Sequence, residues 1–260
     1  MNNWLLFFFL LITVGILILS FISYLSKRRK VSDNKSALYR SLLEKEVFFY
    51  QHLNDKQKDR FLKAVLAFLE RTHIEGVGTR VEDIDRILIA ASAIIPIFAF
   101  DGWHYPHLSN VILYPETFNE AFQYQGNRRN TLGMVGDGFM NGQMILSKKA
   151  LRAGFSKQKQ QSNTAIHEFV HLLDKSDGSI DGVPELLLGK ANISPWIHLI
   201  HHEMRAIEQG KSDIDPYAST NTAEFFAVAA EYFFTDPKHL QVRHPQLFAM
   251  LNQIFHHPAA

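Results

Sequence analysis

The sequence predicts a mainly α-helical domain with a small β element, an α+β fold, preceded by one transmembrane helix. Three observations support this prediction. Apolar residues recur with the 3.6-residue period of a helix in several long segments. Two short stretches, residues 110–115 and 142–147, have the composition of strands bounded by turn residues. The amino-terminal stretch from Trp4 to Leu25 contains no charged residue.

The composition limits the classes of function. The 260 residues suffice for one sizeable domain. Lys and Arg number 27 against 26 Asp and Glu, so no strong basic balance indicates direct binding of nucleic acid. The chain has no cysteine, which excludes disulfides and thiolate ligands. Histidines and carboxylates therefore remain as donors for zinc.

The apolar stretch that begins at Trp4 and ends at Leu25 is long enough to span a bilayer. The basic cluster at residues 27–30 follows it, and by the positive-inside rule the bulk of the chain faces the cytoplasm. We therefore expect a single-pass protein of the bacterial inner membrane. A cleaved secretory signal is the alternative, but it needs a charged n-region and a small-residue cleavage site, and neither is clear. The expected domains are an anchor at 1–30, a linker at 31–41 and one domain at 42–260.

Helical periodicity begins in residues 56–72, where apolar side chains form one stripe opposite Lys and Arg. This pattern is typical of an amphipathic helix packed on a core. The stripe consists of Phe61, Leu62, Val65, Phe68 and Leu69. Residues 87–100 are apolar throughout, but this segment is short and contains Pro96. We expect it to be a buried helix and its exit rather than a second membrane span.

Two further helices are expected after a loop at residues 177–184. Residues 195–210 have a helical pattern that ends at a glycine, a common residue just after a helix. A strongly apolar helix follows, with Thr220 or Thr222 as its N-cap, and it ends before Pro237.

The motif H-E-x-x-H occupies residues 167–171. Positions four apart lie on the same face of a helix, so His167 and His171 can direct their imidazoles to one point, with Glu168 beside them. The polar residues before the motif can open a helix, and the apolar residues within it give the helix a buried side. Imidazoles among so much apolar sequence need hydrogen bonds or a metal. A pair of histidines held by hydrogen bonds alone is the alternative.

Catalytic zinc takes three protein ligands, so the two histidines predict a third donor. Asp177 stands where an extended motif would place a third histidine, which indicates a distal ligand instead. Glu224 is the best candidate, because it lies in an apolar helix where a carboxylate needs a partner. Glu231 shares roughly the same face and is either the rival ligand or a residue that orients one histidine. Asp174 is another residue that could orient an imidazole.

These residues resemble a known family. The pairing of "HEFVHLLD" with "DPYASTNTAEFFAVAAEYFF" resembles the Mlc titration factor A family of zinc metallopeptidases and, more distantly, the catalytic domain of the lethal factor zinc peptidase. The resemblance covers most of the sequence after residue 41. It implies a zincin-like metallopeptidase domain that binds one Zn²⁺ per chain through His167, His171 and Glu224.

The same resemblance assigns the chemistry. Glu168 is the general base, which activates a zinc-bound water for attack on a peptide carbonyl and passes the proton to the leaving amine. Tyr217 steadies the developing oxyanion. Without the resemblance, Tyr217 is simply a tyrosine in the turn after Pro216. The family is associated with a glucose-responsive transcriptional repressor, so such a repressor is an expected partner.

Other residues have weaker signals. Residues 143–147 are expected to be the edge strand that binds an extended substrate. His104 and His107, in a loop rich in aromatic residues, are candidates to line the cleft. The remaining clustered histidines are expected to be solvated or locally hydrogen-bonded, namely His198, His201, His202, His256 and His257.

Three classes of function remain open. The first is a membrane-anchored, zinc-dependent peptidase that acts on peptides or proteins. The second is a zinc-stabilised binding protein that sequesters a transcriptional repressor and has weak peptidase activity. The third, a metal-free helical scaffold, predicts no stoichiometric zinc. Glu168 separates the first two, because a pure binding role has no use for a base beside the metal.

Overall fold

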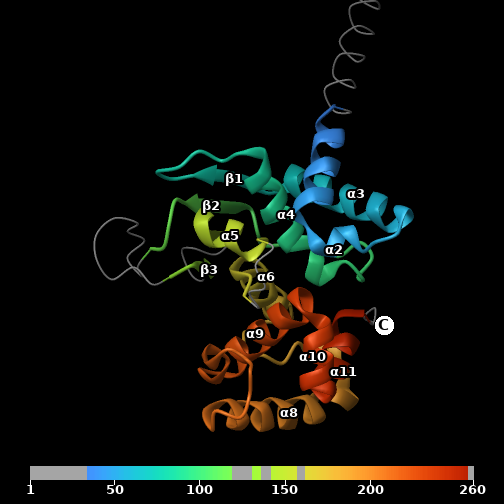
Figure 1. The fold of residues 1–260 in the computed structure, drawn as a ribbon, viewed down its shortest axis with the longest axis vertical. Coiled ribbons are helices and arrows are strands. Elements are labelled where there is room, and N and C mark those ends of the chain that lie inside the picture. The colour runs from blue at the N-terminus through green and yellow to red at the C-terminus, as the bar shows by residue number, and fades with distance from the viewer. Residues whose placement is uncertain (1–33, 119–130, 136–141, 157–161, 257–260) are drawn as a thin grey trace, which may run out of the picture. The chain divides into compact units, whose positions relative to one another are not determined.

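The computed structural model describes residues 34–118, 131–135, 142–156 and 162–256 (Figure 1). The chain divides into two compact units, Met1–Ser41 and Leu42–Ala260. The first unit is described only from residue 34, and residues 34–41 are helical. The second unit contains all the candidate site residues.

The second unit is mainly helical with a small mixed sheet, as expected for an α+β fold. Its helices are α2 (Phe48–Gln51), α3 (Asp55–Arg71), α4 (Asp83–Ile97), α5 (Lys148–Gly154), α6 (Thr164–Asp174), α7 (Glu185–Leu188), α8 (Lys190–Glu208), α9 (Thr222–Thr235), α10 (Pro237–Arg243) and α11 (Pro245–His256). Two 3₁₀ helices are η2 (Lys175–Asp177) and η3 (Pro216–Ser219). The strands are β1 (His73–Gly76), β2 (Asn110–Tyr114), β3 (Gly133–Val135) and β4 (Gln143–Ser147).

The strands form one sheet in the order β1-β2-β4-β3. β1, β2 and β4 are parallel, and β3 is antiparallel to β4. Ile145 of β4 faces Ile112 on one side and Met134 on the other. β2 and β4 confirm the two predicted strands. The prediction that β4 is an edge strand is wrong, because β4 is paired on both sides; among the described residues, β3 ends the sheet.

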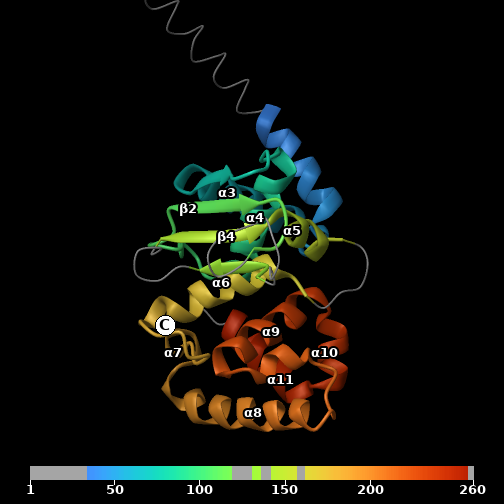
Figure 2. The same cartoon turned by 90° about the vertical axis from the view of Figure 1, so that its left-hand side faces the viewer.

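Helix α6, which carries the H-E-x-x-H motif, lies between the sheet and the carboxyl-terminal helices (Figures 1 and 2). It packs against α4, α5 and β3 on one side and against α9 on the other. Phe169 of α6 makes an edge contact with Phe68 of α3 and a tilted contact with Tyr105. The Tyr105 hydroxyl donates to the carbonyl of Ala93 in α4 at 2.8 Å. The motif is therefore held on a helix fixed from both sides.

The apolar segment predicted as a buried helix is α4, and nearly all of its residues are buried. Its first turn also carries a buried carboxylate, Asp85, which accepts a hydrogen bond from Arg152 Nε at 2.7 Å. Lys148 Nζ lies 3.1 Å from the other oxygen of Asp85. Both cations belong to α5, so this ion-pair group fixes α5, the helix that precedes α6, to the beginning of α4.

The predicted location in the bacterial inner membrane is corrected by the structure. Among the residues that the structure describes, no helix is long and apolar enough to cross a membrane. Spanning requires about 20 apolar residues, whereas the apolar helices α4 and α9 have 15 and 14 residues. The longer helix α8 contains several charged residues. The stretch from Trp4 to Leu25, on which the prediction depended, lies outside the described residues.

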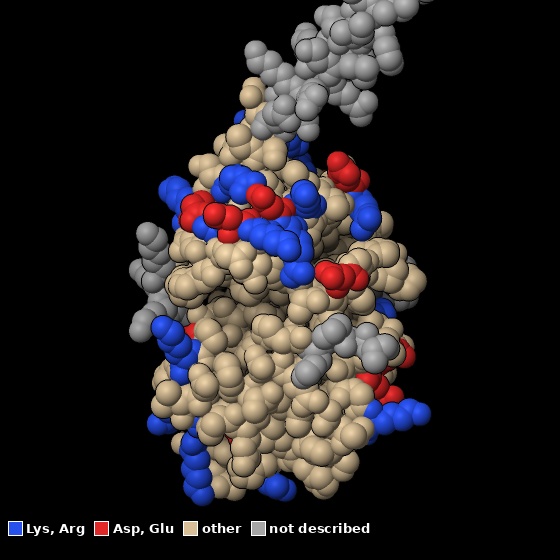
Figure 3. All heavy atoms as spheres, turned by 90° about the vertical axis from the view of Figure 1, so that its right-hand side faces the viewer, with Lys and Arg blue, Asp and Glu red and all other residues tan. Residues whose placement is uncertain are grey.

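Charged side chains of both signs are mixed on the surface. On the face that Figure 3 draws, Lys and Arg side chains lie next to Asp and Glu side chains, and most of the remaining surface is uncharged. The net charge of the chain is +1. This face therefore presents no extended field of one sign toward a charged macromolecule.

Candidate metal centre

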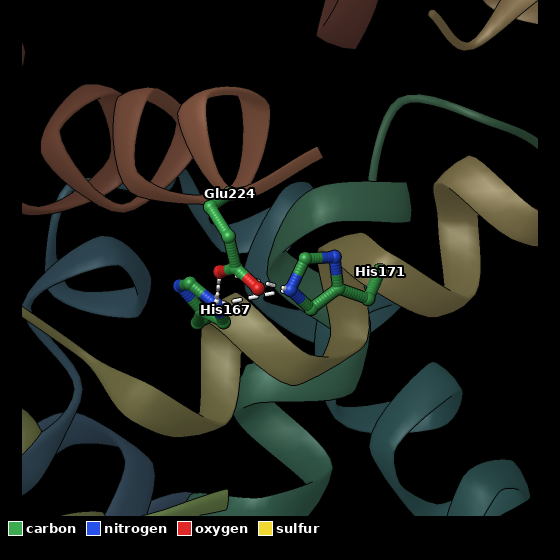
Figure 4. A group of neighbouring side chains, drawn as sticks. All are labelled: His167, His171 and Glu224. Atoms are coloured by element: carbon green, nitrogen blue, oxygen red, sulfur yellow. Dashed lines mark hydrogen bonds and ion pairs between the residues drawn. The ribbon is translucent and has the colours of Figure 1, made fainter. Parts of the chain in front are cut away.

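Helix α6 places its two histidines one turn apart on one face. Its N-cap is Asn163, whose side-chain oxygen accepts a hydrogen bond from Ile166 N at 3.1 Å. This cap starts the helix four residues before the first histidine. The Nε2 atoms of His167 and His171 are 3.0 Å apart (Figure 4). The two imidazoles therefore converge on one point, as the spacing predicts.

Helix α9 brings the third donor to the same point. Its N-cap is Asn221, which accepts a hydrogen bond from Glu224 N at 2.9 Å. Glu224 Oε2 lies 2.9 Å from His167 Nε2 and 3.4 Å from His171 Nε2. In Figure 4 the carboxylate points down from α9 between the two imidazoles of α6. The structure thus brings together the three residues that the sequence analysis named as ligands.

The arrangement of these donors fits a divalent metal ion. Single donor atoms of His167, His171 and Glu224 all lie within 4.8 Å of one another. Two imidazole nitrogens and a carboxylate oxygen that face one another repel unless a cation lies between them, and one proton can bridge only one pair. Ligand atoms of a tetrahedral zinc ion lie about 3.3 Å apart, close to the separations found here. The chemistry of the donors, two nitrogens and one oxygen, suits zinc.

Glu231 lies on the other side of the first histidine. One of its oxygens accepts from His167 Nδ1 at 2.6 Å, and the other accepts from the backbone N–H of Asn163 at 2.5 Å. Glu231 is buried. It therefore orients the imidazole, so that Nε2 faces the donor cluster, and it does not occupy a ligand position beside Glu224. Of the two roles that the sequence left open, the geometry favours the orienting one.

The pKa shifts of His167 and Glu224 show that this cluster favours a positive charge. Burial lowers the pKa of His167, but hydrogen bonds with Glu224 and Glu231 outweigh it and raise the pKa to about 10. Burial raises the pKa of Glu224, but hydrogen bonds with His167 and His171 outweigh it and hold that pKa below its usual range. Without a metal, the carboxylates thus hold a proton on His167. A metal ion bound at the cluster would take the place of that proton.

Glu168 follows the first histidine on α6 and is buried. Burial raises the pKa of its carboxyl above the ordinary value, although the neighbouring imidazoles oppose this effect. Strand β3 passes directly against it: a Cβ atom added to Gly133 would lie 2.6 Å from Glu168 Oε1 and 2.7 Å from its Cγ. Only glycine allows this close approach. A lone glycine within a short strand was the sequence signal that could have found this contact.

Tyr217 lies in η3, close to the donor cluster. Asp215 caps this 3₁₀ helix and accepts from Tyr217 N at 2.9 Å. The Tyr217 ring centroid is 6.2 Å from that of His167, and the side chain is 53% exposed. Burial and the negative charges of Glu224 and Glu168 raise the pKa of the phenol. The phenol therefore stays protonated and can donate a hydrogen bond at the open side of the cluster.

Asp174 does not orient an imidazole in the way that we expected. One of its oxygens accepts from Gly182 N at 2.8 Å, while its other oxygen and His171 Nδ1 are buried without a hydrogen-bond partner. Burial raises the pKa of Asp174 to about 7. Its contact holds the loop after α6 against the first turn of α9, where Thr222 Oγ1 donates to the carbonyl of Asp181 at 2.5 Å. Asp174 thus supports the loop beside the site.

The other histidines named from the sequence are not members of the donor cluster. All of those that the structure describes are exposed, namely His104, His107, His198, His201, His202 and His256. His257 lies outside the described residues. His244, a mostly buried histidine between α10 and α11, could not be recognised from the sequence, because it has no neighbouring motif.

The chain is similar to known proteins over most of its length. The profile of the family described as "Glucose-regulated metallo-peptidase M90" matches residues 23–256. An uncharacterized protein of Synechocystis sp. is 28% identical over 229 residues, which cover 84% of this chain and 82% of that protein. Mlc titration factor A of Cronobacter sakazakii is 26% identical over 218 residues, 75% of this chain and 77% of that protein. Mlc titration factor A of Yersinia pestis is 27% identical over 219 residues, with coverage of 75% and 76%.

Proposed function

Because the chain belongs to the glucose-regulated metallo-peptidase M90 family, we propose that it is a zinc-dependent peptidase that hydrolyses peptide bonds. His167, His171 and Glu224 are the proposed ligands of one zinc ion. The observation that carries the proposal is the convergence of these three donors beside the buried carboxylate of Glu168. Three protein ligands leave a position open for chemistry, as in catalytic zinc sites.

The residues around the cluster have separate roles in this proposal. When bound, zinc supplies Lewis acidity, which polarises a peptide carbonyl and makes water acidic enough to lose a proton near neutral pH. Glu168 takes this proton and delivers it to the nitrogen of the leaving amine. Burial raises the pKa of Glu168, which favours a carboxyl group that both accepts and releases a proton. Tyr217 donates its phenol hydrogen to the oxygen on which negative charge develops.

The proposed place for an extended substrate is the edge of β3 that is not paired with another described strand. Among the described residues this strand ends the sheet, and its Gly133 touches Glu168. A peptide added there as a further strand would form backbone hydrogen bonds and place one of its carbonyls next to the base. This assigns to β3 the role that the sequence analysis gave to residues 143–147.

A second candidate function is the binding of a regulatory protein. The relatives from Cronobacter sakazakii and Yersinia pestis carry the name Mlc titration factor A, which describes titration of Mlc. In this alternative, zinc stabilises the fold and a transcriptional repressor binds the folded surface, while peptidase activity is weak. The proposed base distinguishes the two functions, because capture of a partner does not require proton transfer by Glu168.

The test combines metal content with hydrolysis. The full chain is purified as wild type and as Glu168→Gln, together with Glu208→Gln, a matched change at an exposed position near the end of α8. Zinc is measured by elemental analysis, and cleavage is measured on a mixed peptide library. We expect one zinc per chain in all three proteins and a loss of at least about 100-fold in turnover only in Glu168→Gln.

Each other outcome has a clear meaning. Zinc without cleavage in any of the proteins would favour the binding function. Equal cleavage by wild type and Glu168→Gln would contradict the role of Glu168. The absence of zinc from a folded wild-type chain would overturn the proposed metal centre.

A further inference from the structure

A second buried group of charged residues lies away from the donor cluster, where α8, α9 and α10 meet. Its central residue is His244, whose side chain is 10% exposed. His244 Nδ1 lies 2.9 Å from Glu203 Oε2 of α8, and His244 Nε2 lies 2.7 Å from Asp213 Oδ1, in the segment between α8 and η3. One imidazole therefore bridges two carboxylates from different parts of the chain.

This geometry requires a charged imidazole. A neutral histidine has a single N–H, so it could donate to only one carboxylate and would turn a lone pair toward the other. The imidazolium donates to both and balances part of their charge. Hydrogen bonding to Glu203 and Asp213 outweighs burial and raises the pKa of His244 above its ordinary value of 6.5. The two nitrogens face different carboxylates, so the group does not converge on a point as a metal site does.

Asp213 has further contacts. Its Oδ2 accepts from the hydroxyl of the buried Tyr232 at 2.8 Å. Arg243 Nε lies 3.7 Å from Oδ1, and His239 Nε2 lies 3.8 Å from Oδ2. The other oxygen of Glu203 lies 3.6 Å from Nδ1 of the exposed His202. His244 and Tyr232 make the short contacts, so these two residues fix the position of Asp213.

Asp213 lies four residues before Tyr217, and the chain between them is also fixed. Ile214 is 2% exposed, and Asp215 caps the 3₁₀ helix that carries Tyr217. On α9, Tyr232 directly follows Glu231, the carboxylate that orients His167. Adjacent residues of α9 thus serve the metal centre on one side and the segment that carries Tyr217 on the other.

We propose that His244 is a positioning residue, which holds Asp213 against α8 and α9 as an imidazolium and thereby fixes the segment from Asp213 to Tyr217 beside the metal centre. The effect on hydrolysis rests on the proposed function, whereas the effect on the segment does not. Loss of the proton from His244 breaks one of its two bonds and leaves two carboxylates facing each other across a neutral ring. The segment then loosens, and Tyr217 loses its fixed place.

The sign of the pH dependence follows from the raised pKa. Because folding raises the pKa of His244, its stabilising effect is complete below about pH 6.5 and is lost as the pH rises through the raised value. The backbone N–H groups of the segment should therefore be best protected from hydrogen exchange in mild acid, and this protection should decrease in alkali.

The test measures backbone hydrogen exchange by mass spectrometry, in peptides that cover residues 209–221, on the full chain. The variant is His244→Gln, which keeps a polar side chain but cannot carry the charge. The matched control is His239→Gln, which changes a more exposed histidine that is farther from Asp213. At pH 6 we expect exchange of this segment to be about tenfold faster in His244→Gln than in wild type, and unchanged in His239→Gln. Equal exchange in His244→Gln and wild type would overturn the proposal.

A second pair of readouts separates positioning from general damage. Zinc affinity should be the same in His244→Gln and wild type, since the three ligands are intact. With peptide substrate, kcat should decrease and KM should change little, because Tyr217 acts on charge that develops during the reaction. If the wild type does not hydrolyse peptides, the proposed function fails, and hydrogen exchange still decides whether His244 fixes the segment.

If His244→Gln does not fold, the same hydrogen-exchange measurement on the wild type and on a milder variant still tests the proposal. After correction for the intrinsic effect of pH on exchange, protection of the segment in wild type should decrease between pH 6 and pH 9. Tyr232→Phe removes only the phenol hydrogen bond to Asp213 and should raise exchange of the same peptides about fivefold. Unchanged exchange in Tyr232→Phe together with pH-independent protection in the wild type would contradict the proposal.

Discussion

At the residue scale, Glu224 and Glu231 show how position gives identical side chains different roles. They lie two turns apart on α9, and both face His167, but they contact opposite nitrogens of its ring. Glu224 is partly exposed at the beginning of the helix, where the donor cluster is open. Glu231 is buried, and its second oxygen is taken by the backbone N–H of Asn163. Glu224 is therefore placed where it could hold a metal ion together with the histidines, whereas Glu231 holds the His167 ring in position.

Gly133 offers a test of how closely Glu168, the proposed base, must be held. In Gly133→Ala the new methyl group would overlap the Glu168 carboxylate, which must then move by a few tenths of an ångström or more. Misplacement of a catalytic group on the order of 1 Å can reduce turnover about 100-fold. We expect a decrease of this order in kcat/KM with unchanged zinc content, measured by peptide hydrolysis and elemental analysis.

The control for this substitution is Gly189→Ala. A methyl group there meets open space, but φ is +68°, so the change should cost on the order of 1 kcal/mol of stability. Its kcat/KM should be unchanged. Full activity of Gly133→Ala would mean that β3 does not determine the position of Glu168.

At the element scale, asparagine caps start both helices that carry the donors. Asn163 begins α6 and Asn221 begins α9, and in each case the side-chain oxygen accepts a backbone N–H from the first turn. The cap of α9 binds the N–H of Glu224 itself. The backbone that carries the proposed third ligand is thus ordered by one hydrogen bond at the end of a helix, where four N–H groups lack partners within the helix.

Substitution of this cap should destabilise the protein by a modest and measurable amount. We expect Asn221→Ala to lower the free energy of unfolding by about 1 kcal/mol, because the N–H of Glu224 loses its acceptor. Asn221→Ser keeps an acceptor at the same position and should lose much less. Urea denaturation of the two variants and wild type measures the difference. Equal stability of Asn221→Ala and wild type would show that the cap contributes nothing.

The elements differ in how far the sequence could predict them. The helices α3, α4 and α9 follow from apolar periodicity, and β2 and β4 follow from short apolar runs between turn residues. β1 and β3 were not predicted, because strands of four and three residues are too short to show alternation. Sheet order also depends on pairing between distant segments, which is why β4 was expected at the edge. The prediction that Thr220 or Thr222 is the N-cap of α9 was wrong. The N-cap is Asn221, which lies between them.

The candidate site was predictable to a similar degree. The i, i+4 spacing of His167 and His171 and the presence of a carboxylate in an apolar helix identify three residues that the structure brings together. The sequence favoured Glu224 as the third donor but left Glu231 open as a rival, since both lie on roughly one face of α9. The structure favours an orienting role for Glu231, because the beginning of α6 approaches it through the N–H of Asn163. Contacts of this kind depend on tertiary packing and leave no local pattern.

At the scale of the whole unit Leu42–Ala260, the donor cluster joins parts that fold from distant segments. α6 packs on α4, α5 and the sheet, whereas α9 packs with α8, α10 and α11. The histidines come from the first group and Glu224 from the second. In the absence of a metal, this junction holds two imidazoles and three buried or half-buried carboxylates, those of Glu168, Glu224 and Glu231. A bound ion would both link the two groups and relieve the repulsion between their polar atoms.

Removal of the metal should therefore lower the stability of the whole unit. A ligand that binds only the folded chain stabilises it by about 2.7 kcal/mol at a free concentration 100 times its Kd. For a chain of this size, each kcal/mol shifts Tm by roughly 2–4 °C. We expect a strong chelator to lower the Tm of wild type by roughly 5–10 °C, measured by differential scanning calorimetry, and added zinc to restore it. Glu224→Ala, which removes the only donor from α9, should respond far less to either treatment. The contrary result is a wild-type Tm that does not change with the chelator, although elemental analysis confirms the loss of zinc. It would mean that packing alone holds the two groups of elements together.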